Sequence, residues 1–294
     1  MKNLIIRLYG LYLNTLALVS PAKAAEHGFL LFCKPFRVPV NEKQKQFFNT
    51  AEKITVDHED EKIQAYRWGT GKKKILFLHG WQSHTYRWKP YIEALKSDEF
   101  TIYSIDAPGH GLSSGSFLSV PLYSSLIENF IRDNGPFHSV VGHSLGGFSL
   151  LHTFHKYPLL QVNQLVLLAP PGEASDFISV FQKTLRLNSR TLNLVLDHFA
   201  SRYEVTPDYF STRRFIDSVN VKGLIIHDED DDEAPYHYSI PLHKAWERSR
   251  LITTKGFGHN LRSTTVVKEV VDFITEPSEA LPTSHVLFAQ REKS

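Results

Sequence analysis

The sequence predicts an α/β fold, with a mostly parallel central sheet and helices on both faces. Continuous apolar runs at 75–78 and 165–168 are typical of strands that are covered on both faces. Apolar residues at helical spacing occupy 121–132 and 145–156, so strands and helices alternate along the chain. A composition of 42% hydrophobic and 22% charged residues fits a globular protein and excludes a disordered chain or a multispan membrane protein.

The predicted core of this fold occupies residues 51–171 and 221–276. It opens with a hairpin, whose strands we expect at 54–56 and 63–66. Further strand patterns lie at 101–105, 140–141, 224–226 and 251–253. An amphipathic helix pattern at 266–274 closes the core, and residues 277–294 are expected to form a C-terminal tail.

Residues 172–220 interrupt the alternation of strands and helices. They contain no clear strand pattern, and their apolar residues have helical spacing, as at Phe177 and Phe181. An insertion of this length between two strands of one sheet predicts a helical lid over one edge of the sheet. The interval is rich in aromatic residues and has equal numbers of acidic and basic side chains. This composition favours an apolar or aromatic substrate group over a charged one.

Residues 1–50 are expected to form an N-terminal helical segment and a connector. Residues 1–25 combine Lys2 and Arg7 with an apolar run at 8–19 and with small residues near position 24. These features are typical of a signal peptide, whose cleavage after residues 1–24 would give a secreted or periplasmic protein. The run is too short to cross a bilayer as a helix, which needs about 20 residues.

The alternative interpretation of residues 1–25 is an amphipathic helix docked on the domain. Leu4, Leu8, Leu11 and Tyr12 lie near helical spacing, and apolar sequence continues beyond the supposed cleavage site, at 29–32. We favour this interpretation, which predicts a cytoplasmic protein that retains its N-terminus. Peripheral contact with a membrane through residues 1–25 is compatible with it.

Charge and cysteine content limit the partners. Lys and Arg number 33 against 31 Asp and Glu, and this balance argues against nucleic acid as the main partner. The single cysteine, Cys33, excludes an internal disulfide framework and a multi-cysteine metal site. A small-molecule substrate is the expected partner. We expect no cofactor and no metal, and the sequence leaves the oligomeric state open.

The strongest chemical signal is a G-x-S-x-G motif at residues 142–146. It follows a buried-strand pattern and precedes a helix pattern, which is the context that a nucleophilic serine requires. Gly142 and Gly146 leave room for the sharp turn that lifts the Ser144 hydroxyl clear of the backbone. The N–H of Leu145, at the positive end of the helix, is then placed to bind a reacting oxygen.

A serine hydroxyl needs a base and a group that orients the base. The strand pattern at 222–227 ends in a run of acidic residues, 228–233, and a Gly-flanked loop further on carries His259. Ser144, an acid and His259 thus follow one another along the chain. The loop after the strand at 75–78 brings a second oxyanion donor, the N–H of Trp81, while His79 beside it is expected to brace the loop.

Together these motifs resemble the α/β-hydrolase superfamily over roughly residues 50–275. The resemblance rests on HG-W after a strand, IDAPGHGLSS, VVGHSLGG, IIHDEDDDEAP and GFGHN. It implies Ser144 as nucleophile, His259 as base and a carboxylate after the strand at 222–227. In similar sequences that acid stands three residues after the end of the strand and four before a proline, which selects Asp231. Position 228 is Asp where a glycine is common.

The sequence therefore predicts a serine hydrolase that cleaves an ester-like bond by acyl transfer. Other chemistry on the same scaffold remains open, including that of a peptidase, a lactonase, a thioesterase or a carbon–carbon hydrolase. A ligand sensor that retains the three residues but turns over slowly is the alternative from a different class.

Overall fold

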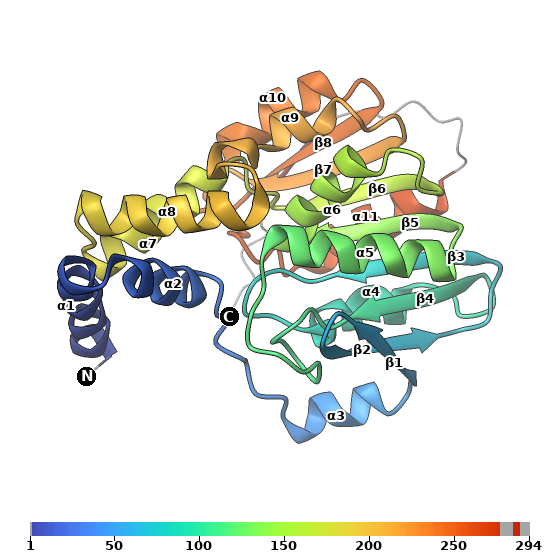
Figure 1. Cartoon of the computed structure of the whole chain (residues 1–294). Coiled ribbons are helices and arrows are strands. Elements are labelled where there is room, and N and C mark those ends of the chain that lie inside the picture. Colours follow the sequence, from blue (N-terminus) through green and yellow to red (C-terminus); the bar gives the residue numbers. More distant parts are fainter. Residues whose placement is uncertain (1, 277–284, 289–294) are drawn as a thin grey trace, which may run out of the picture. The chain divides into compact units, whose positions relative to one another are not determined.

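The computed structural model describes residues 2–276 and 285–288 and divides into two compact units (Figure 1). The α/β unit comprises Pro35–Gly172 and Phe215–Ser294. The helical unit comprises Met1–Lys34 and Glu173–Arg214. The segment 1–34 and most of the interval expected to form a lid thus belong to one unit, although about 140 residues separate them in the sequence.

The α/β unit contains a sheet with the strand order β1-β2-β4-β3-β5-β6-β7-β8-β9. β1 and β2 form the expected antiparallel hairpin, β2 pairs antiparallel with β4, and all other pairs are parallel. The predicted mostly parallel sheet is therefore confirmed. The strands are β1 (Glu52–His58), β2 (Glu61–Trp68), β3 (Lys73–Leu78), β4 (Phe100–Ile105), β5 (Phe137–His143), β6 (Val162–Leu168), β7 (Lys222–Asp228), β8 (Ser249–Lys255) and β9 (His285–Phe288).

β9 falls within the expected C-terminal tail and pairs parallel with β8. The rest of that tail, 277–284 and 289–294, lies outside the described residues.

Helices cover both faces of this sheet. Successive side chains of a strand point to opposite faces, and in β3 all four residues of 75–78 are buried, so both faces must be covered. Figure 1 shows α5 and α6 together in front of the sheet and α4 and α11 behind it. The helices of this unit are α3 (Glu42–Phe48), α4 (Lys89–Ala94), α5 (Val120–Asn134), α6 (Leu145–Lys156), α10 (Ser239–Ala245) and α11 (Thr264–Thr275), with 3-10 turns η1 (Thr85–Trp88) and η3 (Tyr236–Tyr238).

Local sequence signals set where these helices begin. The Ser119 side chain accepts a hydrogen bond from Leu122 N–H and caps α5, and a proline stands in its first turn. Asn41 and Gln44 form a reciprocal capping box at α3. α3 is part of the expected connector, and its Phe47 and Phe48 enter the main apolar core.

The helical unit consists of α1 (Lys2–Val19), α2 (Pro21–Phe32), α7 (Ala174–Leu185) and α8 (Ser189–Tyr203), with the 3-10 turn η2 (Pro207–Tyr209). The short helix α9 (Thr212–Ile216) spans the division between the units in the sequence. Among the residues that the structure describes, no helix combines the length and the apolar character needed to cross a bilayer.

The N-terminal segment is built into this unit by packing and by hydrogen bonds. Leu13 is fully buried and packs with Leu185 and Leu187. The Asn14 side chain donates to the Arg186 carbonyl at 3.0 Å and accepts from the Asn188 N–H at 3.1 Å. Asn14 therefore satisfies backbone groups at the turn between α7 and α8.

The face on which α1 docks differs from the expected one. Leu4, Leu8, Leu11 and Tyr12 are exposed, whereas the buried face carries Gly10, Leu13 and Ala17. The physical reason is close helix approach: a Cβ on Gly10 would lie 1.7 Å from the Leu185 carbonyl oxygen. The small residues permit this approach, so that Leu13 is buried between them while Leu4, Leu8, Leu11 and Tyr12 remain outside.

We expect Leu13→Ala to destabilise the helical unit by about 2–5 kcal/mol, because it removes a fully buried side chain. Leu11→Ala is the matched control on the same helix, since Leu11 is 63% exposed. Hydrogen exchange of residues 173–214 measures the local effect. Equal protection in the two variants would contradict the packing described here.

Candidate active site

Ser144 stands on a sharp turn between β5, which ends at His143, and α6, which begins at Leu145. Its φ of 50° and ψ of −123° are rare for a residue with a side chain. A Cβ on Gly142 would lie 2.6 Å from Gly147 Cα, and one on Gly146 would lie 2.4 Å from the Leu78 carbonyl oxygen. Only glycine fits at these two positions, as the motif predicts.

The structure brings Ser144, His259 and Asp231 into one hydrogen-bonded chain. The Ser144 Oγ lies 3.0 Å from His259 Nε2, and His259 Nδ1 lies 2.8 Å from Asp231 Oδ2. All three residues are buried. They come from the turn after β5, the loop between β8 and α11 and the loop after β7, which all meet at the carboxyl edge of the sheet.

The Asp231 carboxylate is held by hydrogen bonds on both oxygens. Oδ1 accepts from the N–H groups of Glu233 and Ala234 at 2.9 and 2.8 Å. Burial alone would raise the pKa of Asp231, but hydrogen bonds from His227, His259 and Ala234 outweigh it and lower the pKa well below its usual value. Asp231 therefore stays ionised beside the His259 ring.

The neighbouring acids do not share this position. The side chains of Asp230 and Asp232 are exposed, whereas that of Asp231 is fully buried. Asp228, the residue in place of the common glycine, ends β7 and accepts hydrogen bonds from the Thr254 hydroxyl and the Phe257 N–H. Asp228 thus ties the His259 loop to β7. The carboxylate that contacts His259 is that of Asp231, the residue selected by the register of the resemblance.

His227 is a buried neighbour of this chain that the sequence analysis missed. Its Nε2 lies 3.1 Å from Asp231 Oδ2 and 2.9 Å from the Ala234 carbonyl oxygen. Both partners only accept, so Nε2 carries the hydrogen, and Nδ1 accepts from the Ser239 hydroxyl at 2.7 Å. The available signal was a histidine that directly follows the apolar run Leu224–Ile226 and directly precedes the acids.

His143 is a second buried histidine that the sequence analysis missed, and it lies beside the base, His259. It is buried, and burial lowers its pKa well below the usual value, so the ring is neutral. Its Nε2–H donates to the His259 carbonyl oxygen at 2.9 Å. This bond fixes the loop that carries His259 to the end of β5.

The loop after β3 lies against Ser144, as the oxyanion prediction requires. A Cβ on Gly80 would lie 2.9 Å from Ser144 Cβ. His79 braces the loop: its Nε2 accepts from the Ala107 N–H, and its Nδ1–H donates to the Gly80 carbonyl. Leu145 opens α6, where backbone N–H groups have no helical acceptor. The roles of the Trp81 and Leu145 N–H groups as oxyanion donors stay predictions.

Comparison with known proteins agrees with these motifs. The family model described as alpha/beta hydrolase family matches residues 75–276. A pimeloyl-(acyl-carrier protein) methyl ester esterase of Nitrosomonas europaea is 30% identical over 139 residues, which cover 47% of this chain and 52% of the relative. Esterase Rv0045c of Mycobacterium tuberculosis is 34% identical over 110 residues, 36% of this chain and 35% of the relative. The chain thus spans about half the length, or less, of these curated relatives.

A solved structure extends the likeness in fold. The crystal structure of a membrane phospholipase A matches with a TM-score of 0.61 at 14% identity and covers 94% of this chain and 100% of its own. At this level of identity the likeness concerns the fold alone.

We expect Asp231→Asn to lower turnover by at least about 10²-fold, because the orienting carboxylate sets the imidazole tautomer and stabilises its cation. Asp230→Asn and Asp232→Asn should each stay within about tenfold, since exposed charges are screened. The measurement is turnover of one ester by all three purified, folded variants. A large loss in Asp230→Asn or Asp232→Asn with little in Asp231→Asn would reassign the acid.

We expect His227→Phe to lower kcat about tenfold with KM little changed, because Asp231 Oδ2 loses one of its two donors. His227→Gln keeps an N–H donor and should recover most of the loss. Steady-state kinetics on both variants separates hydrogen bonding from packing. Equal losses in the two would show that His227 acts by filling space.

Proposed function

The chain belongs to the alpha/beta hydrolase family, and from this we propose that it is a serine hydrolase that cleaves an ester-like bond through an acyl-enzyme. One observation carries the proposal: the unbroken hydrogen-bonded chain from Ser144 through His259 to Asp231, at a turn between strand and helix. A structural Gly-rich turn does not need a base and a buried carboxylate in line with its serine.

The proposed reaction proceeds by acyl transfer. Ser144 Oγ attacks the carbonyl carbon while His259 Nε2 takes its proton, and the ionised Asp231 stabilises the imidazolium that forms. The N–H groups of Trp81 and Leu145 hold the negative oxygen of the tetrahedral intermediate. His259 then returns the proton to the leaving alcohol, and water attacks the acyl-enzyme by the same route. None of these steps uses a metal or an organic cofactor.

The proposed substrate is a small ester with an apolar or aromatic acyl group. Two curated relatives carry esterase names, one of them for a methyl ester, which supports ester cleavage over amide cleavage. The aromatic content of 172–220 supports an apolar acyl group, and selection of that group by a lid from this interval stays a prediction. Peptidase, lactonase, thioesterase or carbon–carbon hydrolase activity remains the alternative, with a slow ligand sensor as the other class.

We expect Ser144→Ala to abolish labelling by a fluorophosphonate and to lower ester turnover by at least roughly 10³-fold, because His259 and Asp231 cannot act without the nucleophile. Ser116→Ala, an exposed serine of the same unit, is the control and should label normally. Ester hydrolysis by Ser144→Ala at nearly the wild-type rate would overturn the mechanism.

Turnover of p-nitrophenyl esters of graded chain length separates the alternatives. An esterase should label rapidly and hydrolyse at least one ester of the series fast. Rapid labelling with little turnover across the series would instead support the sensor or a different bond.

A further inference from the structure

The exposed face of α1 has no evident role in the proposed chemistry. Its outward side chains include Leu4, Leu8, Leu11 and Leu18, with Leu4 61% and Leu8 55% exposed. At 100° per residue these four leucines lie within one stripe along the helix, and Ile5, Tyr9 and Tyr12 widen it on one side. A continuous apolar stripe on a helix surface marks a contact that the isolated chain does not make.

We propose that this stripe lies in the surface of an anionic lipid bilayer, with α1 parallel to the membrane plane. This inference is independent of the proposed hydrolase activity. Helices of this kind place an apolar face in the boundary between headgroups and acyl chains and rely on basic residues for attraction to anionic lipids.

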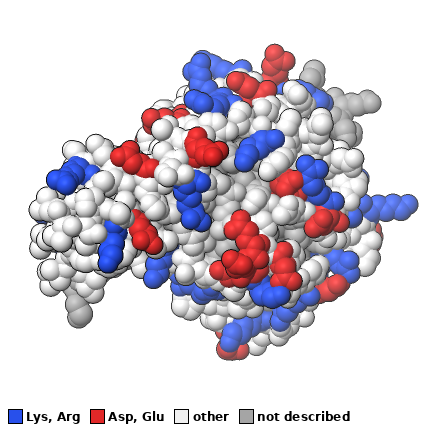
Figure 2. Space-filling view, in the orientation of Figure 1, with Lys and Arg blue, Asp and Glu red and all other residues white. Residues whose placement is uncertain are grey.

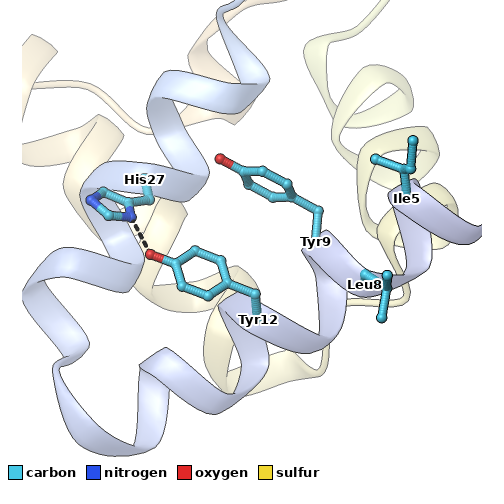
Figure 3. Close-up of a pocket in the computed structure, with 5 residues that line it drawn as sticks. All are labelled: Ile5, Leu8, Tyr9, Tyr12 and His27. Carbon is cyan, nitrogen blue, oxygen red and sulfur yellow. Dashed lines mark hydrogen bonds between the residues drawn. The ribbon is translucent and has the colours of Figure 1, made fainter.

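Two hydroxyl groups within the stripe, those of Thr15 and Tyr12, are already hydrogen-bonded. The Thr15 hydroxyl, which falls among the leucines, donates to the Leu11 carbonyl oxygen of the same helix at 2.9 Å. The Tyr12 hydroxyl is hydrogen-bonded to His27 Nδ1 at 2.8 Å (Figure 3). Desolvation of this face therefore leaves neither hydroxyl without a partner, which removes the main cost of entering an apolar medium.

The two tyrosines suit the depth at which such a helix lies. The rings of Tyr9 and Tyr12 pack edge to face, with their centroids 5.7 Å apart. Together with Ile5, Leu8 and His27 they line an open groove of about 430 Å³ (Figure 3). Aromatic rings with one polar end favour the headgroup level of a bilayer. The open groove offers space for part of a lipid chain or headgroup.

The charges of the segment favour anionic lipid over a second copy of the chain. Residues 1–34 contain four basic residues, Lys2, Arg7, Lys23 and Lys34, and one acidic residue, Glu26. Arg7 and Lys23 are exposed. Figure 2 shows the surface of the helical unit as mostly white, with a few separate basic and acidic side chains. In a symmetric dimer this face would meet itself and bring like charges together, whereas an anionic surface attracts them.

The inward face of α1 explains why the helix lies on the membrane rather than crossing it. Leu13 packs against the turn between α7 and α8, and Asn14 is hydrogen-bonded to it. The outward stripe is therefore the face of α1 that can enter lipid. Crossing would also bury Arg7 in the hydrocarbon.

The test is sedimentation of the protein of residues 1–294 with vesicles of phosphatidylcholine alone or with 30% phosphatidylglycerol. The wild-type protein should bind the anionic vesicles and lose that binding at high salt. The triple variant Leu4→Ser/Leu8→Ser/Leu11→Ser should bind at least about tenfold more weakly, because each change removes apolar area from the interface. Leu159→Ser, which changes a leucine that is 93% exposed in the α/β unit, is the matched control and should bind normally.

A charge variant tests the attraction of the basic residues to anionic lipid. Arg7→Gln should weaken binding to anionic vesicles several-fold and reduce its salt dependence. Thermal unfolding and fluorophosphonate labelling of every variant check that the fold and the proposed active site are intact, so that failure of this proposal is distinguishable from failure of the hydrolase assignment.

Three outcomes would overturn the proposal. Binding of the triple variant as tight as that of the wild type would show that another surface contacts lipid. Equal binding to both kinds of vesicle would exclude the anionic preference. A wild-type protein that ignores vesicles but forms dimers, which the triple variant abolishes, would assign the stripe to a second copy of the chain.

Discussion

The turn at Ser144 is the constraint that the rest of the α/β unit has to satisfy. A residue with a side chain at φ of 50° costs of the order of 1–3 kcal/mol and persists only where its surroundings hold it. The Ser144 N–H donates to the Leu168 carbonyl of β6, while α6 begins so close to the end of β3 that only glycine fits at 146. These contacts require β3, β5 and β6 to be adjacent and parallel, and the buried apolar runs of those strands secure that order. The hydrophobic core thus maintains the geometry of the serine.

The buried carboxylate of Asp231 is the second constraint on the site. The cost of removing an ionised group from water must be offset by hydrogen bonds. Asp231 receives two backbone N–H donors on Oδ1 and two histidine donors on Oδ2. The histidines have different tasks. His227 is fixed by Ser239 and Ala234 and serves only the carboxylate, whereas His259 also reaches Ser144. The neutral His143 holds the His259 backbone from the other side. The acid and the base are therefore positioned by separate supports.

The sequence predicts a site residue well when the motif that identifies it lies within a few neighbouring residues. Ser144 and His259 stand in short motifs whose glycines and flanking elements are visible in the sequence, and the fold follows from apolar runs of strand length. Asp231 needed a register argument, since three adjacent aspartates look alike without the turn after β7. His227 was missed because a histidine at the end of a strand has many structural uses. The docked face of α1 was assigned wrongly because the helix is apolar almost all round. There the small residues Gly10 and Ala17 allow close approach beside the buried Leu13, while Leu4, Leu8 and Leu11 face outward.

The helical unit shows why the spacing of apolar residues does not predict which distant segments of a chain pack together. α7 and α8 are amphipathic, yet α7 buries only Leu185 and α8 only Thr191 and Val195 among their described residues. Two helices with so little buried surface cannot form a core alone. The N-terminal segment supplies the missing side chains: Leu13 packs with Leu185, and the Phe29 ring contacts those of Phe199 and Tyr203. The insertion and the first helices therefore stabilise each other. Removal of residues 1–24 as a signal peptide would therefore take α1, with Leu13 and Asn14, out of this core. Cleavage of the N-terminus and folding of residues 173–214 are thus physically linked.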